Sequence, residues 1–114
     1  MAELPKETQK DIVQLQSLQR QLQILAAQKQ QFEISVVQAD ATLAELEKAE
    51  GKAYKAIGSV LIESKPKDII AELNEKRKEA NERIETLKAQ EERLAKKAEE
   101  LQKKVQKELE SKTS

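Results

Sequence analysis

Two long heptad patterns, separated by a short glycine-containing segment, constrain this chain more than any other feature. In the first, apolar residues return at alternating intervals of three and four from Leu15 to Leu46, and nine of its ten positions are apolar. The second runs from Ile70 to Glu108, with nine apolar positions of twelve. An apolar period of 3.5 residues makes a narrow stripe along a helix, which another helix covers in a left-handed coiled coil. The sequence therefore predicts a mainly α fold made of paired helices.

The two heptad regions also carry the signals at which helices begin and end. No glycine or proline interrupts residues 6–49 or 67–110, and both stretches are rich in residues of high helix propensity. Pro5 suits the first turn of a helix, where its missing N–H is not needed, and Asp68 suits the positive end of a helix dipole. We therefore predict one helix over residues 6–49 and a second over residues 67–110.

The equal lengths of the predicted helices favour an antiparallel pair formed within one chain. Folding the chain back through the short connection places Leu15 opposite Leu101 and Leu46 opposite Ile70, so each layer receives residues from both helices. A parallel homodimer is the alternative, but it would leave the connecting segment without a role.

Three charged residues interrupt the apolar stripes at heptad position a: Lys29, Arg77 and Glu91. A polar group in such a seam costs stability but penalises wrong alignments, and a long basic side chain can carry its charge to the edge of the seam. We interpret these residues as determinants of register, with Lys29 and Glu91 close enough to pair. A direct role in binding is the alternative.

The connecting segment has the pattern of a β-hairpin over residues 53–64. Gly58 and Ser59 separate two short runs, and a glycine at the first position of a two-residue loop suits a type II′ turn. The second run carries three consecutive apolar residues, which is typical of a strand that is buried on both faces. We predict a single domain over residues 1–114, an antiparallel two-helix coiled-coil hairpin with one short β-hairpin at the connecting end.

The predicted β-hairpin cannot be buried by its own chain, because both helices are committed to each other. An isolated hairpin is marginally stable in water, and its unpaired edges invite further strands. We therefore expect oligomerisation through hairpins of other copies or related chains, and an aggregation-prone loop is the alternative. The expected contacts come from the apolar residues of the hairpin: Tyr54, Ile57, Val60, Leu61 and Ile62.

Composition argues against most catalytic and ligand-binding functions. The chain has no cysteine and no histidine, so thiolate nucleophiles, imidazole bases and the metal sites built on them are absent. Charged residues make up 37% with zero net charge and only 2% aromatics, which does not fit a nucleic-acid interface. No apolar run is long enough to cross a bilayer, and the N-terminus lacks a signal-peptide pattern. We expect a cytoplasmic protein that is not an enzyme, with no catalytic residues, no metal, no cofactor, no nucleic acid and no membrane partner.

Several of these segments together resemble the β-class subunit of prefoldin. They are Leu4-Pro5, the Gln-rich first helix, the segment Ala53–Ile62 and the charged stretch Leu101–Val105. The most specific part is the spacing Tyr-Lys-x-x-Gly-x-x-Leu-Ile, which begins at Tyr54, and the similarity covers nearly the whole chain. Ala53 departs from the pattern, since a larger β-branched residue is common there in the family.

The resemblance implies a non-enzymatic chaperone subunit and names its partners. It implies a hetero-hexamer of two α-class and four β-class chains, in which the hairpins form a double β-barrel platform that carries coiled-coil arms. It further implies that the arm tips hold unfolded client proteins and pass them to a group II chaperonin without ATP. The competing hypothesis is a structural coiled-coil tether or adaptor.

Apolar residues outside the seam near the open end of the helices are the feature that separates these hypotheses. A tether needs a solvated outer face, whereas a chaperone that holds clients needs spare hydrophobic surface. Asp11 and Glu108 occupy core positions there, so we expect the helix ends to fray and expose nearby seam residues. The expected client-binding residues are Leu4, Ile12, Val13, Leu15, Leu101, Val105 and Leu109, and further off-seam hydrophobic residues are Ile24, Ile34 and Val37.

Overall fold

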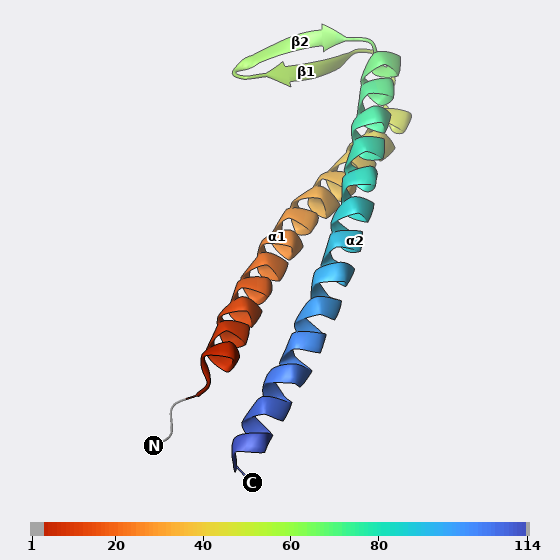
Figure 1. The fold of residues 1–114 in the computed structure, drawn as a ribbon. Coiled ribbons are helices and arrows are strands. Elements are labelled where there is room, and N and C mark those ends of the chain that lie inside the picture. Colours follow the sequence, from red (N-terminus) through yellow and green to blue (C-terminus); the bar gives the residue numbers. More distant parts are fainter. Residues whose placement is uncertain (1–3, 114) are drawn as a thin grey trace. The chain divides into compact units, whose positions relative to one another are not determined.

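The computed structural model describes residues 4–113, which fold in the order helix, strand, strand, helix (Figure 1). The elements are α1 (Lys6–Lys48), β1 (Ala53–Ile57), β2 (Val60–Ser64) and α2 (Pro66–Thr113). The predicted fold class, two long helices with one β-hairpin between them, is confirmed. The second helix extends three residues beyond its predicted end at residue 110, because no glycine or proline follows Glu110 to stop it.

Main-chain carbonyls organise the first turn of each helix. The Pro5 carbonyl accepts a hydrogen bond from the Gln9 N–H at 3.0 Å, and the Gln9 side chain donates to the Leu4 carbonyl at 2.8 Å. At the start of α2 the Lys65 carbonyl accepts from the N–H groups of Asp68 and Ile69 at 3.0 and 3.2 Å. α2 therefore begins directly after β2, with a single residue between them.

The two strands form an antiparallel sheet in the register expected for a two-residue turn. Ile57 pairs with Val60 beside the turn, and Ala53 pairs with Ser64 at the base. Gly58 has a positive φ of 59°, while no non-glycine residue among those described does. A positive φ at the first loop residue and not at the second agrees with the φ pattern expected of a type II′ turn.

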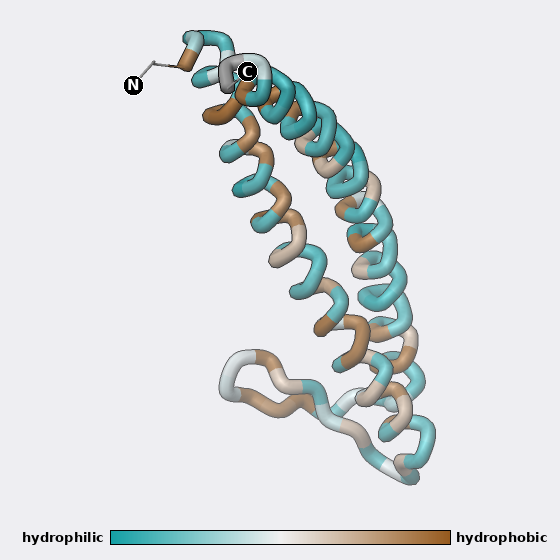
Figure 2. The backbone as a smooth tube through the Cα atoms, turned by 90° about the horizontal axis from the view of Figure 1, so that it is seen from below, coloured by the Kyte–Doolittle hydropathy of each residue, from teal (hydrophilic) through white to brown (hydrophobic). Residues whose placement is uncertain are grey.

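The contacts of the chain divide it into two compact units. The terminal unit joins the N-terminal part of α1, up to Gln28, to the C-terminal part of α2, from Thr86 onward. The hairpin unit comprises Lys29–Glu85 and contains the β-hairpin. Hydrophobic positions recur along the helices and also occupy the hairpin strands (Figure 2). Among residues 4–113, no helix is both long enough and apolar enough to span a membrane.

In the terminal unit the helices pack antiparallel, in the predicted alignment. The Thr8 hydroxyl donates a hydrogen bond to Glu108, seven residues before Leu15 and seven after Leu101, which are the residues that the heptads place opposite each other. Leu18, Leu87 and Val105 are buried along this contact.

In the hairpin unit the alignment is the same. Arg77 donates to Asp40 at 2.9 Å, and the Arg83 guanidinium lies 5.7 Å from the centre of the Phe32 ring. Both pairs run in the antiparallel sense. The buried apolar side chains of this unit are Ala39, Leu43, Ala53 and Ala80. Arg77, a charged residue in the stripe, reaches the edge of the seam with its side chain 42% exposed.

Candidate functional site

The β-hairpin presents the most exposed apolar surface of the hairpin unit. All five residues expected to drive oligomerisation are exposed, and Leu61 reaches 70%. The five are Tyr54, Ile57, Val60, Leu61 and Ile62. Large apolar side chains left in water on a two-stranded sheet are a strong indication of an interaction surface.

The strand register shows that this apolar surface covers both faces of the hairpin. Directly paired residues share a face, so Leu61 lies on the face of Ala56 and Tyr54, while Ile62 lies on the face of Lys55. Both outer strand edges are also unpaired, because the sheet contains only β1 and β2. Unpaired edges and apolar groups on both faces suit pairing with further strands.

An ion pair joins the middle of β1 to α2. Lys55 Nζ lies 2.6 and 2.8 Å from the two carboxylate oxygens of Glu72, and Lys76 Nζ approaches the same carboxylate at 3.7 Å. The hydrogen bond from Lys55 lowers the pKa of Glu72 below its ordinary value of 4.5, and the nearby positive charge of Lys76 adds to the effect.

The seven residues expected to bind clients lie in different environments within the terminal unit. Val13 and Leu109 are exposed, at 61% and 38%. Val105 is buried in the seam, and the remaining four are half-buried: Leu4, Ile12, Leu15 and Leu101. The structure therefore brings two of the seven freely to the surface, whereas the others lie partly or wholly within the helix contact.

A polar network occupies the seam beside these residues. Thr8 and Asp11 are buried at 2% and 7% exposure, although both are polar. Lys104 Nζ lies 3.2 Å from Asp11 and 3.2 Å from Glu7, and it is 4.0 Å from Glu108. The close carboxylate of Asp11, followed by that of Glu7, raises the pKa of Lys104 above its ordinary 10.5.

This network changes the interpretation of the charged core positions. From the sequence, Asp11 and Glu108 indicated a seam that weakens and frays. In the structure Glu108 accepts from Thr8 and Asp11 faces Lys104, so the charges have partners across the helices. The carboxylates of Glu7, Asp11 and Glu108 approach one another within 4.8 Å, but the Lys104 ammonium already supplies the positive charge among them. Thr8, Lys104 and Glu7 were missed because their roles depend on a partner about a hundred residues away.

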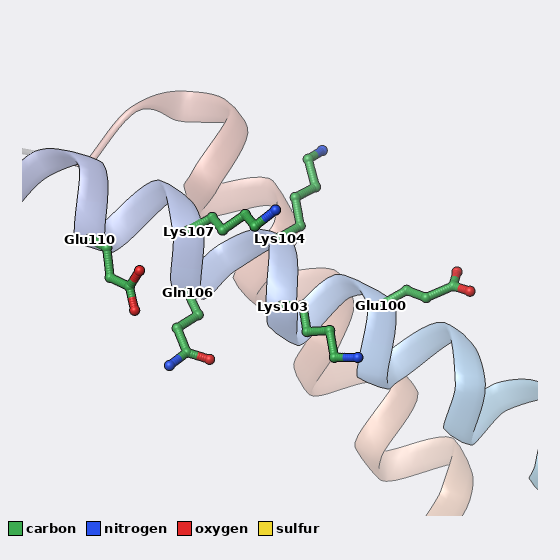
Figure 3. Close-up of a pocket in the computed structure, with 6 residues that line it drawn as sticks. All are labelled: Glu100, Lys103, Lys104, Gln106, Lys107 and Glu110. Carbon is green, nitrogen blue, oxygen red and sulfur yellow. The ribbon is translucent and has the colours of Figure 1, made fainter.

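Shallow hollows mark the remaining surface of the terminal unit, and two of them differ in character. One lies along α2 between Glu100 and Glu110, where side chains of mixed charge from a single helix spread outward in different directions (Figure 3). The other is more apolar and lies beside Ile24, whose neighbours Leu25 and Leu94 belong to the facing stripes. Neither gathers groups that could act as acid, base or nucleophile.

Comparison with known proteins gives a consistent result. The family model described as "Prefoldin subunit" matches residues 9–112. Prefoldin subunit beta of Archaeoglobus fulgidus is 41% identical over 108 residues, covering 93% of each chain. That of Methanococcoides burtonii is 37% identical over 103 residues, covering 89% of this chain and 88% of the relative.

The likeness extends to the solved structures. The crystal structure of the prefoldin beta subunit from Thermococcus strain KS-1 matches with a TM-score of 0.85 and 31% identity, and the match covers 94% of this chain and 96% of that one. The chain therefore belongs to the prefoldin subunit family, as a β-class subunit of a chaperone rather than an enzyme.

Proposed function

We propose that this subunit assembles through its β-hairpin and captures non-native proteins, without ATP, at the open end of its helix pair. Membership of the family implies a prefoldin complex with other subunits. The proposal adds a hexamer of two α-class and four β-class chains that works in the cytoplasm and delivers clients to a group II chaperonin. The two compact units then act together as one domain.

The observation that carries this proposal is the exposed hairpin with apolar side chains on both faces. Leu61 at 70% and Val60 at 57% exposure would each remove a large apolar area from water in an assembly. Burial of apolar surface contributes about 25 cal/mol per Å², so five such residues on each of several chains supply a substantial driving force. Hydrogen bonding of further strands to the two open edges would also fix the orientation of the partner chains.

Client capture rests on the apolar residues at the open end of the terminal unit. Val13 and Leu109 offer exposed contacts, and the half-buried Leu15 and Leu101 lie beside them along the chain's two stripes. Each contact is small, so one subunit would hold a client weakly. Several subunits that engage one unfolded chain would add their contacts by avidity, which suits a chaperone that must release its client.

A tether or adaptor is the second candidate, and the charged outer surface of α2 favours it. The side chains between Glu100 and Glu110 form a solvated face of mixed charge, as a passive connector needs (Figure 3). A tether would show normal assembly but no effect on an aggregating protein.

Aggregation suppression tests the proposal and separates the two candidates. The complex, reconstituted with an α-class chain, should suppress aggregation of a chemically unfolded enzyme at substoichiometric amounts and without nucleotide. The double variant Val13→Ser/Leu109→Ser should keep the mass of the complex but lose most of this suppression. Ile24→Ser is the matched control, because Ile24 is similarly exposed at 57% but lies further from the helix ends.

The outcomes discriminate clearly. Full activity of the double variant would move client binding away from the open end. Equal loss in Ile24→Ser would extend the site along α1. A complex of normal mass that never suppresses aggregation would favour the tether.

A further inference from the structure

We propose that Lys55 is a positioning residue, whose ion pair with Glu72 fixes the angle between the β-hairpin and the first turns of α2. This inference rests on the proposed assembly through the hairpin, because that angle sets the direction in which each helix pair leaves the platform. All the groups involved lie within the hairpin unit.

The connection between the hairpin and α2 is a pivot. Only Lys65 separates the end of β2 at Ser64 from the start of α2 at Pro66. On the other side, the link from Lys48 to Ala53 contains Gly51 with a positive φ of 98°, and nothing packs within 4 Å of where its Cβ would lie. The angle of the sheet to the helix then depends on contacts made between the two.

Lys55 and Glu72 close a triangle around that pivot. Lys55 pairs with Ile62, three residues before Lys65, which is about 10 Å from the pivot at the usual strand rise. Glu72 lies seven residues after Lys65, also about 10 Å from the pivot at the usual helix rise. The contact between Lys55 and Glu72 forms the third side of this triangle. The angle between the hairpin and α2 is therefore fixed while the contact persists.

The geometry of the contact suits this role. Lys55 Nζ reaches both carboxylate oxygens of Glu72, at 2.6 and 2.8 Å, and both side chains are about 40% exposed. Lys76 holds the same carboxylate from the next turn of α2 at 3.7 Å. The apolar contact at the base comes from Ala53, which is buried but has only one methyl group to pack. Among residues 4–113, no other ion pair or side-chain hydrogen bond joins the hairpin to a helix.

The same chain offers a matched control in Lys52. Lys52 Nζ lies 3.8 Å from Glu63, so this pair sits near the base of the hairpin. Neither partner belongs to α2. Lys52→Gln therefore removes the same charge as Lys55→Gln but leaves the triangle closed.

A spin-label distance measurement within one chain tests the inference directly. The chain has no cysteine, so Ser59→Cys in the turn and Lys78→Cys on α2 give two unique labelling sites. Labelled chains diluted with unlabelled ones in the complex report the hairpin–helix distance by double electron–electron resonance. We expect a narrow peak that is lost in Lys55→Gln and in Glu72→Gln, kept in Lys52→Gln, and recovered in the charge exchange Lys55→Glu/Glu72→Lys.

Salt provides a second readout, because a half-exposed ion pair is screened. At about 1 M salt the Debye length falls to about 3 Å, and the wild-type peak should broaden towards that of Lys55→Gln. An unchanged peak in Lys55→Gln, a failed recovery in the charge exchange, or equal broadening in Lys52→Gln would each overturn the inference. Sedimentation of the same samples reads assembly separately, so failure of the proposed function and failure of the positioning role give different results.

Discussion

The hydrogen bond between Thr8 and Glu108 provides a sharp test of the polar network at the open end of the helices. Thr8→Val keeps the shape of the side chain but removes the hydroxyl that donates to Glu108. Thr8 is 2% exposed, so no water replaces the lost donor there, whereas the Glu108 side chain is 25% exposed and recovers part of its solvation. A hydrogen bond to a charged group contributes about 1.5–3 kcal/mol, and this partial exposure reduces the expected loss of unfolding free energy to about 1–2 kcal/mol.

The double variant Thr8→Val/Glu108→Leu makes the test specific to the pair. Glu108→Leu alone leaves the buried Thr8 hydroxyl without its acceptor and should also cost about 1–2 kcal/mol. Removing both partners leaves neither a donor nor an acceptor of this bond unpaired, which can be nearly neutral or stabilising. We therefore expect the double variant to be more stable than either single variant, with a coupling energy of about 1 kcal/mol or more.

Denaturant unfolding followed by helical circular dichroism measures these values at one fixed protein concentration, because assembly makes stability depend on concentration. Thr42→Val is the control, since Thr42 is exposed and its hydroxyl donates only to the Gln38 carbonyl of its own helix. It should change the unfolding free energy by less than about 0.5 kcal/mol. Equal effects of Thr8→Val and Thr42→Val, or losses that simply add in the double variant, would refute a coupled buried pair.

Three further predictions concern assembly, core packing and pH. Leu61→Asp should leave helicity intact but dissociate the complex, because a charge would be buried in the hairpin interface at a cost of several kcal/mol; wild-type mass on ultracentrifugation would contradict this. Leu87→Ala, at a position only 2% exposed, should lower the unfolding free energy by about 2–5 kcal/mol, and a loss below that range in denaturant unfolding would show a contact that relaxes around the cavity. Lys55 lowers the pKa of Glu72, so the stabilisation of the fold by this ion pair is complete above the ordinary glutamate pKa of 4.5 and is lost as pH falls through the lowered pKa. The difference in unfolding free energy between wild type and Glu72→Gln should therefore vanish in acid. A difference that stays constant with pH would count against the pair.

Local patterns were sufficient to predict the elements and their alignment. The stripes from Leu15 to Leu46 and from Ile70 to Glu108 have a period that only paired helices satisfy, and that period does not depend on distant residues. Gly58 supplies the positive φ that a type II′ turn demands at its position. The hairpin residues of the candidate assembly site could be predicted for the same reason, because the sequence itself shows apolar side chains on both faces of a short strand.

The tertiary structure alone decided what the charged residues do. Asp11 and Glu108 look like defects in a stripe when each helix is considered separately, because a buried charge without a partner is costly. Their partners Lys104 and Thr8 lie on the facing helix, and Lys55 finds Glu72 only when the strand folds back onto α2. Apolar burial depends on periodicity along one chain segment, but an ion pair depends on two side chains meeting within about 4 Å, and that meeting exists only in the folded molecule.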